Sequence, residues 1–346
     1  MNFFKAFTND DIASTRTLLH EAIPLTGTLL SSSVYLDSNV KDYSHGYWQS
    51  VYDYNYASAS ANQLVDITAG YASGATCQYT AGSQYAIKRS IYNQMAQVLV
   101  GYDSTGSIMN FDEDGNFVAG GTKVTGTMFL SFSRLLVKDE IKRGSFSMTL
   151  GVSQAYTDPN QWGSQVTITD AAATSSYLSN SPAGEYAPLM SGSETYGLIY
   201  YQAGVVVLNV QKIFLSGSNG ATPCLMTGSG AGSYVTAMLA SGSIVTCGDA
   251  LRHRIGNISF NNTTELNSSI YFCRINHNDF LYSANPSYLN GSKIRVKTVA
   301  TDAPIAYFTA IGLYSADGEL LATAKVSEPI KRSPDTEQIL RIRLDF

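Results

Sequence analysis

The chain has 346 residues and a net charge of −5, and charged residues make up only 14% of the sequence. This length suffices for two or three domains, each with its own core. The charged fraction is well below the roughly 25% of an average soluble domain, and 23 tyrosines indicate a surface rich in hydroxyl and aromatic groups. Interfaces favour this mixture, because their cores are poor in charge and rich in tyrosine. The plainer interpretation is an ordinary Ser/Thr/Tyr-rich β-protein.

The composition argues against several classes of protein. A nucleic-acid-binding protein needs a basic patch, and the longest basic cluster here is Lys331-Arg332. The N-terminal MNFFKAFTNDD lacks the basic start and apolar core of a signal peptide. No apolar run approaches the roughly 18 residues of a membrane span. We therefore expect a protein made in a host cytoplasm, with no nucleic acid as its main partner and no membrane span.

The first elements are predicted from caps and spacing. Residues 1–23 carry a helix signal, with Thr8 or Asn9 as cap and Pro24 as terminator. Residues 28–75 mix aromatic and small side chains without a clear period. The clearest helix is predicted over 83–100, because apolar residues recur there at helical spacing and Gly101 follows. A second helix is predicted over about 130–143, ending at Gly144.

From Ser145 onward the pattern becomes β, with short segments rich in Val, Ile, Tyr and Thr. The Gly/Ser-rich stretch 215–246 reads as a long surface loop. Near the end, Asp317-Gly318 joins two apolar β-type runs, which predicts a two-residue hairpin turn in which both residues have positive φ. In the final QILRIRLDF, apolar residues alternate with polar ones, as in a strand with one buried face. The predicted fold class is β-rich α+β, with a mixed body over 1–250 and a C-terminal antiparallel β-sandwich over 251–346.

Candidate chemical groups have plain explanations in this sequence. The four cysteines are too widely spaced for a zinc or redox motif; they are Cys77, Cys224, Cys247 and Cys273. No histidine lies in a metal-binding or catalytic motif; they are His20, His45, His253 and His277. The segment FDEDGNF (111–117) lacks most ligands of a calcium loop, so a hairpin turn is predicted there. We expect no metal, no cofactor and no catalytic residues.

Several blocks of the chain resemble a family of virion structural proteins from tailed bacteriophages, many of them marine or cyanobacterial. The resemblance rests on IGLYSADGELLATAKVSEPIKRSPDTEQILRIRLDF at the C-terminus, DYSHGYWQSVYDYNYASASANQLVDITAGY at 42–71 and RLLVKDEIKRGSFSMTLGV at 134–152. Similar blocks span nearly the whole chain. Members of this family are described as structural parts of the particle, so the resemblance implies no enzymatic activity.

The resemblance and the composition together predict a part of the virion. The first hypothesis is a tail, baseplate or neck protein that assembles as a symmetric oligomer, with other copies and other virion proteins as partners. A capsid decoration or fibre-attachment protein is the alternative, and a host-glycan hydrolase is the least favoured. We expect the contacts to involve the loop 215–246 and the aromatic segment 43–56. The aromatic side chains of that segment are Tyr43, Tyr47, Trp48, Tyr52, Tyr54 and Tyr56.

Overall fold

The computed structural model divides the chain into two compact units. Unit 1 comprises Met1–Leu18 and Glu265–Phe346, and unit 2 comprises Leu19–Thr264. The division corrects the boundary expected near residue 250, because the C-terminal unit begins at Glu265 and also takes in the N-terminus. The structure describes residues 4–25, 37–75, 83–118, 120–152, 164–214, 242–283, 285–295, 297 and 299–346.

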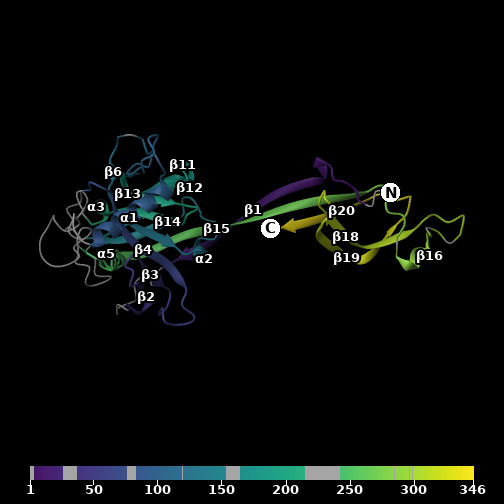
Figure 1. Cartoon of the computed structure of the whole chain (residues 1–346), viewed down its shortest axis with the longest axis horizontal. Helices are drawn as coiled ribbons and strands as arrows, with labels where there is room; N and C mark the ends of the chain where they lie inside the picture. The colour runs from purple at the N-terminus through teal and green to yellow at the C-terminus, as the bar shows by residue number, and fades with distance from the viewer. Residues whose placement is uncertain are drawn as a thin grey trace. The chain divides into compact units, whose positions relative to one another are not determined.

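Strands dominate the described residues, and the β-rich α+β class is confirmed (Figure 1). Fourteen strands form one sheet, in which every pairing between named strands with a resolved register is antiparallel. Its main path runs through β1 (Ile12–Pro24), β15 (Ile255–Ile275), β9 (Ser147–Val152), β10 (Ser164–Thr169), β12 (Gly184–Ser191), β13 (Glu194–Tyr200), β14 (Val205–Asn209), β7 (Gly126–Phe132), β4 (Gln63–Tyr71), β3 (Gln49–Tyr52) and β2 (Val40–Asp42). Three further strands pair beside this path, namely β8 (Glu140–Ile141), β11 (Leu178–Ser181) and β20 (Gln338–Asp345).

Small hairpins and helices complete the described part of the fold. The two-stranded sheets are β5 (Phe111–Asp112) with β6 (Lys123–Val124), β16 (Leu289–Asn290) with β17 (Lys293–Ile294), and β18 (Ala306–Tyr314) with β19 (Leu320–Arg332). The helices are α1 (Ser83–Leu99), α2 (Arg134–Val137), α3 (Val210–Phe214) and α5 (Ile244–Arg252). Short 3-10 turns are η1 (Asn9–Asp11), η2 (Asp37–Asn39), η3 (Ala171–Thr174) and η4 (Pro286–Tyr288).

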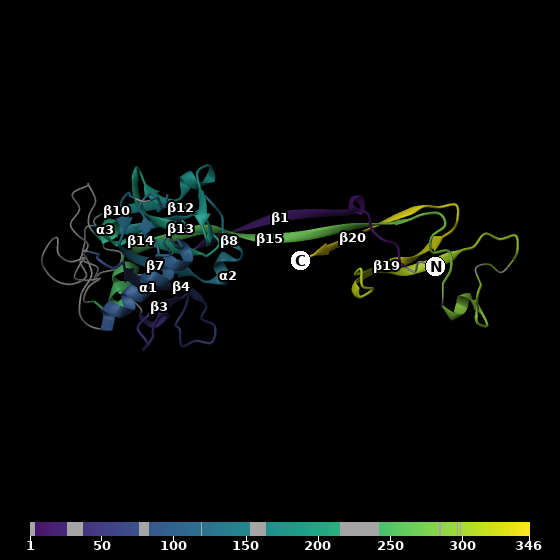
Figure 2. The same ribbon diagram turned by 45° about the horizontal axis from the view of Figure 1, so that its top comes forward.

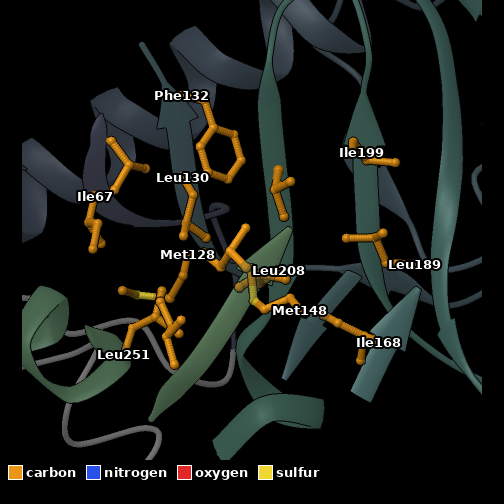
Figure 3. Packing of buried hydrophobic residues seen from close by; sticks show 14 of the residues in the cluster. Ile67, Met128, Leu130, Phe132, Met148, Ile168, Leu189, Ile199, Leu208 and Leu251 are labelled. Carbon is orange, nitrogen blue, oxygen red and sulfur yellow. The ribbon is translucent and has the colours of Figure 1, made fainter. Parts of the chain in front are cut away.

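Unit 2 has a hydrophobic cluster on each face of its sheet. The helix predicted over 83–100 is confirmed as α1, which buries Tyr92, Ala96 and Leu99 against one face. Helix α5 buries Cys247, Ala250 and Leu251 in the cluster on the other face, part of which is shown in Figure 3. Burial on both faces keeps successive residues of the central strands of unit 2 out of water.

The helix predicted over 130–143 is wrong. Strand β7 runs to Phe132, and the helical part is the single turn α2, which ends where Lys138 takes a φ of 60°. In β7, Leu130 belongs to one hydrophobic cluster and Phe129 to the other. A strand buried on both faces has a continuous apolar run, and such a run is easily mistaken for a helix.

The prediction of a helix over 1–23 is also wrong, except for the cap at its start. The Thr8 hydroxyl donates to the Asp11 carboxylate at 2.7 Å, and the main-chain NH of Thr8 donates to the same oxygen at 3.0 Å. This cap starts only the one-turn η1, and the chain then continues as β1, a neighbour of β15 in the sheet. The predicted cap is therefore present. The residues after it form a strand because they pair with a strand some 250 residues away.

Strand β15 explains where the two units divide. Its first residues pair with β9, from Ile255 to Ser259, whereas Ser268–Ile275 pair with β20. The change of partner falls between these two stretches, where the boundary Thr264/Glu265 lies. Within unit 1, the alternation predicted for the C-terminal strand is confirmed, since Ile342 is buried while Arg341 and Arg343 are exposed.

Candidate interaction surfaces

The predicted aromatic segment forms the turn between β2 and β3 and the residues after β3. We call residues 43–56 the aromatic hairpin. Register pairs Asp42 with Gln49, and the turn closes where the Gly46 NH donates to the Tyr43 carbonyl at 3.0 Å. Gly46 has a φ of 67°, a conformation that favours glycine. The short strands and this turn place the aromatic side chains at one edge of the unit 2 sheet.

His45 is the centre of the ring cluster in this turn. Its ring stacks on Tyr43 with centroids 4.9 Å apart and planes inclined by 9°, and it lies 4.4 Å from Trp48 and 5.7 Å from Tyr47. The structure therefore brings together three of the six predicted residues. From the sequence, His45 was noted only as a histidine outside any metal-binding or catalytic motif. Three aromatic residues lie within four positions of His45 in the sequence, and this spacing could have predicted the ring cluster.

The other predicted aromatic residues lie at the end of β3 and after it. Tyr52 and Tyr56 have ring centroids 6.5 Å apart, and Tyr54 is 65% exposed. Tyr47, Trp48 and Tyr56 are also exposed. Aromatic side chains fixed by a turn and a sheet edge offer apolar contact area at little cost in conformational entropy. The geometry is therefore suitable for binding.

Polar groups hold the aromatic hairpin against the sheet. The Ser50 hydroxyl donates to Asp66 at 2.5 Å and lies 3.4 Å from the Tyr43 hydroxyl, while the Gln63 amide donates to Asp66 at 2.6 Å. Burial raises the pKa of Asp66 even though both hydrogen bonds lower it. Burial, and then the hydrogen bond with Tyr43, also raises the pKa of Tyr52.

On the opposite face of β3, Gln49 ties the hairpin to helix α5. Its amide nitrogen donates to Asp42 and to Asp249, each at 2.9 Å, and Asp249 accepts from Arg252 at 2.7 Å. Burial lowers the pKa of Arg252 to about 10. These bonds fix the base of the hairpin on both sides, so its exposed rings are presented by a rigid support.

Unit 1 presents a different kind of surface. It holds 100 of the 346 residues but 13 of the 23 exposed large hydrophobic side chains of the described chain. Both hydrophobic clusters of the described residues lie within unit 2. In unit 1 the exposed set is Phe4, Phe7, Ile12, Leu18, Leu266, Phe280, Val299, Tyr307, Tyr314, Leu320, Leu321, Ile339 and Phe346. The apolar residues of unit 1 thus lie mostly at its surface.

The hairpin predicted at Asp317-Gly318 is present, but the turn has three residues instead of two. The Gly318 NH donates to the Ser315 carbonyl at 3.1 Å, and the Ser315 NH donates to the Glu319 carbonyl at 2.8 Å. Gly318 has a φ of 85°, whereas Asp317 is not among the described residues with positive φ. These bonds form a three-residue hairpin loop that ends in a left-handed glycine. The prediction for Gly318 is confirmed, and the prediction of positive φ at Asp317 is wrong.

The remaining candidate groups are structural in the described chain. The segment 111–117 begins the β5–β6 hairpin, as predicted, and its buried Asp112 is ion-paired with Lys123. Among the residues the structure describes, no group of three or more acidic, histidine or cysteine side chains could hold a metal ion. Cys247 is buried and Cys273 is a half-buried thiol, whereas Cys77, Cys224 and most of the loop 215–246 lie outside the described residues.

Across the helices of the described chain, none is both long enough and apolar enough to cross a membrane. Comparisons of the chain with protein-family models, with curated proteins and with solved structures found no match. Two surfaces bear on function, namely the aromatic hairpin of unit 2 and the exposed apolar residues of unit 1.

Proposed function

We propose that this chain is a non-enzymatic structural component of a tailed-phage virion, in the tail, baseplate or neck, that assembles as a symmetric oligomer. The observation that carries the proposal is the surface of unit 1. Its exposed apolar side chains include Phe346, directly after β20, and Leu321, near the start of β19, which are 78% and 69% exposed. Monomeric proteins rarely leave large contiguous apolar patches uncovered, and obligate interfaces cover such patches.

The resemblance to virion proteins is the basis for placing the chain in the particle. The exposed apolar surface of unit 1 is the basis for proposing that it assembles. Virion parts are held by permanent interfaces, which resemble a domain core divided between chains. Unit 1 buries few apolar residues of its own, namely Ile270, Ile275, Ala306, Leu313 and Ile342 in the described part. Covering by neighbours would complete such a core.

A second candidate is a capsid decoration or fibre-attachment module, and the aromatic hairpin favours it. Exposed aromatic rings on a rigid edge are typical of a docking surface for another protein. In that case Tyr47 and Trp48 contact a different virion protein, while unit 1 still joins copies of this chain.

Two measurements test the proposal. Purified full-length chain is analysed by size-exclusion chromatography with light scattering, and purified particles of the encoding phage are analysed by quantitative mass spectrometry. We expect a single multiple of 37.3 kDa and a fixed copy number per particle, with the chain located in a reconstruction of the particle. A stable 37.3 kDa monomer that is absent from particles would overturn the proposal.

A further inference from the structure

Strand β1 is exposed on both of its faces. Of its 13 residues, from Ile12 to Pro24, only Ala13 and Ile23 are half-buried and the rest are exposed. Ile12 and Leu18, which belong to unit 1, are each 43% exposed. An ordinary strand with one face on a core alternates between buried and exposed residues. In β1 this alternation is missing, so no layer of the described chain covers it.

One edge of β1 is also unpaired in the described chain. In the strand order β1 stands at the end of the path, and its hydrogen-bonded neighbour is β15 (Figure 2). A free edge exposes alternating NH and carbonyl groups that can pair with another strand. Monomeric proteins protect such edges with charges, proline or a very short strand.

The protection of β1 is weak compared with that of β19 and β20. From Ile12 to Leu18 the sequence is IASTRTL, with Arg16 as its one charge, and Arg16 is ion-paired with Glu265. Strand β20 carries exposed Arg341 and Arg343, and β19 carries Lys325 and Pro329. The edge of β1 is therefore poorly protected against pairing with a further strand, as is that of β18, whose sequence AYFTAIGLY carries no charge.

The charges of the two units indicate which partner suits this surface. Unit 1 holds 11 of the 22 basic and 11 of the 27 acidic residues, so it is neutral, and unit 2 carries the whole net charge of −5. A surface with no net charge promotes association of identical copies, whereas net charge opposes it. Copies of unit 1 can meet without the repulsion that copies of unit 2 would experience.

We propose that the residues Ile12–Leu18 of β1 pair edge to edge with a strand of a second copy of this chain, and that this contact covers the exposed apolar residues of unit 1. The inference rests on the proposed function, because it names the partner and the strand through which the oligomer forms. Main-chain hydrogen bonds along β1 supply affinity, and Ile12 and Leu18 supply apolar contact.

The first test compares two leucine variants of the full-length chain. Leu18→Asp places a carboxylate in the proposed contact, and Leu135→Asp is the matched control on α2 of unit 2, where the leucine is 70% exposed. We expect Leu18→Asp to weaken self-association by at least about tenfold, because an unpaired charge would be desolvated. Leu135→Asp should leave it unchanged, and both variants should unfold cooperatively like the parent protein. Equal self-association of Leu18→Asp and the parent would overturn the proposal.

The second test identifies the paired strand by disulfide trapping. Ser14→Cys, Thr15→Cys and Thr17→Cys are made with Cys77, Cys224 and Cys273 replaced by serine. Each variant is oxidised alone and in mixture with Arg341→Cys, which lies on β20. Covalent dimers from one β1 variant alone indicate that β1 pairs with itself, and dimers only in the mixture indicate pairing with β20 of the next copy. Both outcomes support the proposal.

The result that contradicts the proposal is an oligomer without β1 crosslinks. If light scattering shows an oligomer and no β1 variant forms covalent dimers, the β1 contact is wrong while the proposed function stands. If β1 crosslinks form and the chain is absent from purified particles, the contact stands and the virion role is wrong. The two failures are therefore distinguishable.

Discussion

The backbone of Gly70 in β4 lies against the backbone of Tyr92 in α1. A Cβ built on Gly70 would lie 2.9 Å from the Tyr92 nitrogen and 2.9 Å from the Lys88 carbonyl oxygen. Real Cβ atoms do not approach main-chain atoms so closely, so glycine at this position sets the distance between the helix and the sheet. The adjacent Tyr92 hydroxyl donates to the Val124 carbonyl at 2.8 Å and accepts from the Phe111 NH at 3.2 Å.

Gly70→Ala should destabilise unit 2, because α1 must move away from the sheet to admit one methyl group. Overpacking of this kind costs about 1–3 kcal/mol. Urea unfolding followed by circular dichroism measures the loss. Gly318→Ala is a useful comparison, since nothing lies within 4 Å of its Cβ and unit 2 should unfold as in the parent. An unfolding free energy of unit 2 equal to the parent's in Gly70→Ala would show that the close packing is not real.

Gly318→Val should destabilise the β18–β19 hairpin by roughly 1 kcal/mol or more, because a β-branched residue is strained at positive φ. The Cβ would meet open space, so the cost comes from the backbone alone. Ala316→Val is the matched control in the same exposed turn, and we expect it to be nearly neutral. Thermal unfolding of unit 1 checks both variants, and equal melting temperatures would count against the assigned turn.

His45→Ala should loosen the aromatic hairpin, because the ring that Tyr43 and Trp48 pack against is removed. Aromatic pairs contribute about 0.5–1.5 kcal/mol beyond the area they bury. Limited proteolysis should therefore cut residues 43–56 faster in this variant. His277→Ala, an exposed histidine of unit 1, should be cut at the parent's rate. Unchanged cleavage of His45→Ala would indicate that the stack does not order the turn.

The stability of unit 2 should depend on the protonation of Asp66. Burial raises the pKa of this carboxyl above its ordinary value of 3.8, so the folded state binds its proton at a pH where the unfolded chain has released it. Its contribution therefore favours folding at low pH and is lost as the pH rises through the folded pKa. Urea unfolding at about pH 7 and at about pH 4.5 measures how the unfolding free energy changes with pH.

In Asp66→Asn this part of the pH dependence should vanish. Asp103→Asn is the control, because the hydrogen bond from the Thr105 hydroxyl, followed by that from the Ser107 NH, lowers the pKa of Asp103, so its contribution to stability is the same at both pH values. The stability from Asp103 is present above pH 3.8 and is lost as the pH falls below it. An identical pH dependence in Asp66→Asn and the parent would rule out the buried carboxyl as its source.

Local patterns in the sequence were enough for several elements. Helix α1 was predicted from its spacing and its terminal glycine, since an amphipathic helix carries its signal within a few turns. The C-terminal strand was predicted from alternation, and positive φ at Gly318 from the Asp-Gly pair. The aromatic residues of segment 43–56 were found by composition, although their grouping around His45 was not.

The tertiary structure alone decided the rest. Residues 12–24 form a strand because β15, some 250 positions away, offers hydrogen bonds that outweigh a local helix signal. Residues 126–132 form a strand that is buried on both faces, with Leu130 in one hydrophobic cluster and Phe129 in the other, and a fully buried run has no period to read. The exposure of β1 and of the apolar residues of unit 1 depends on which surfaces the fold covers. A linear pattern marks a residue as apolar, but only packing determines whether its own chain buries it.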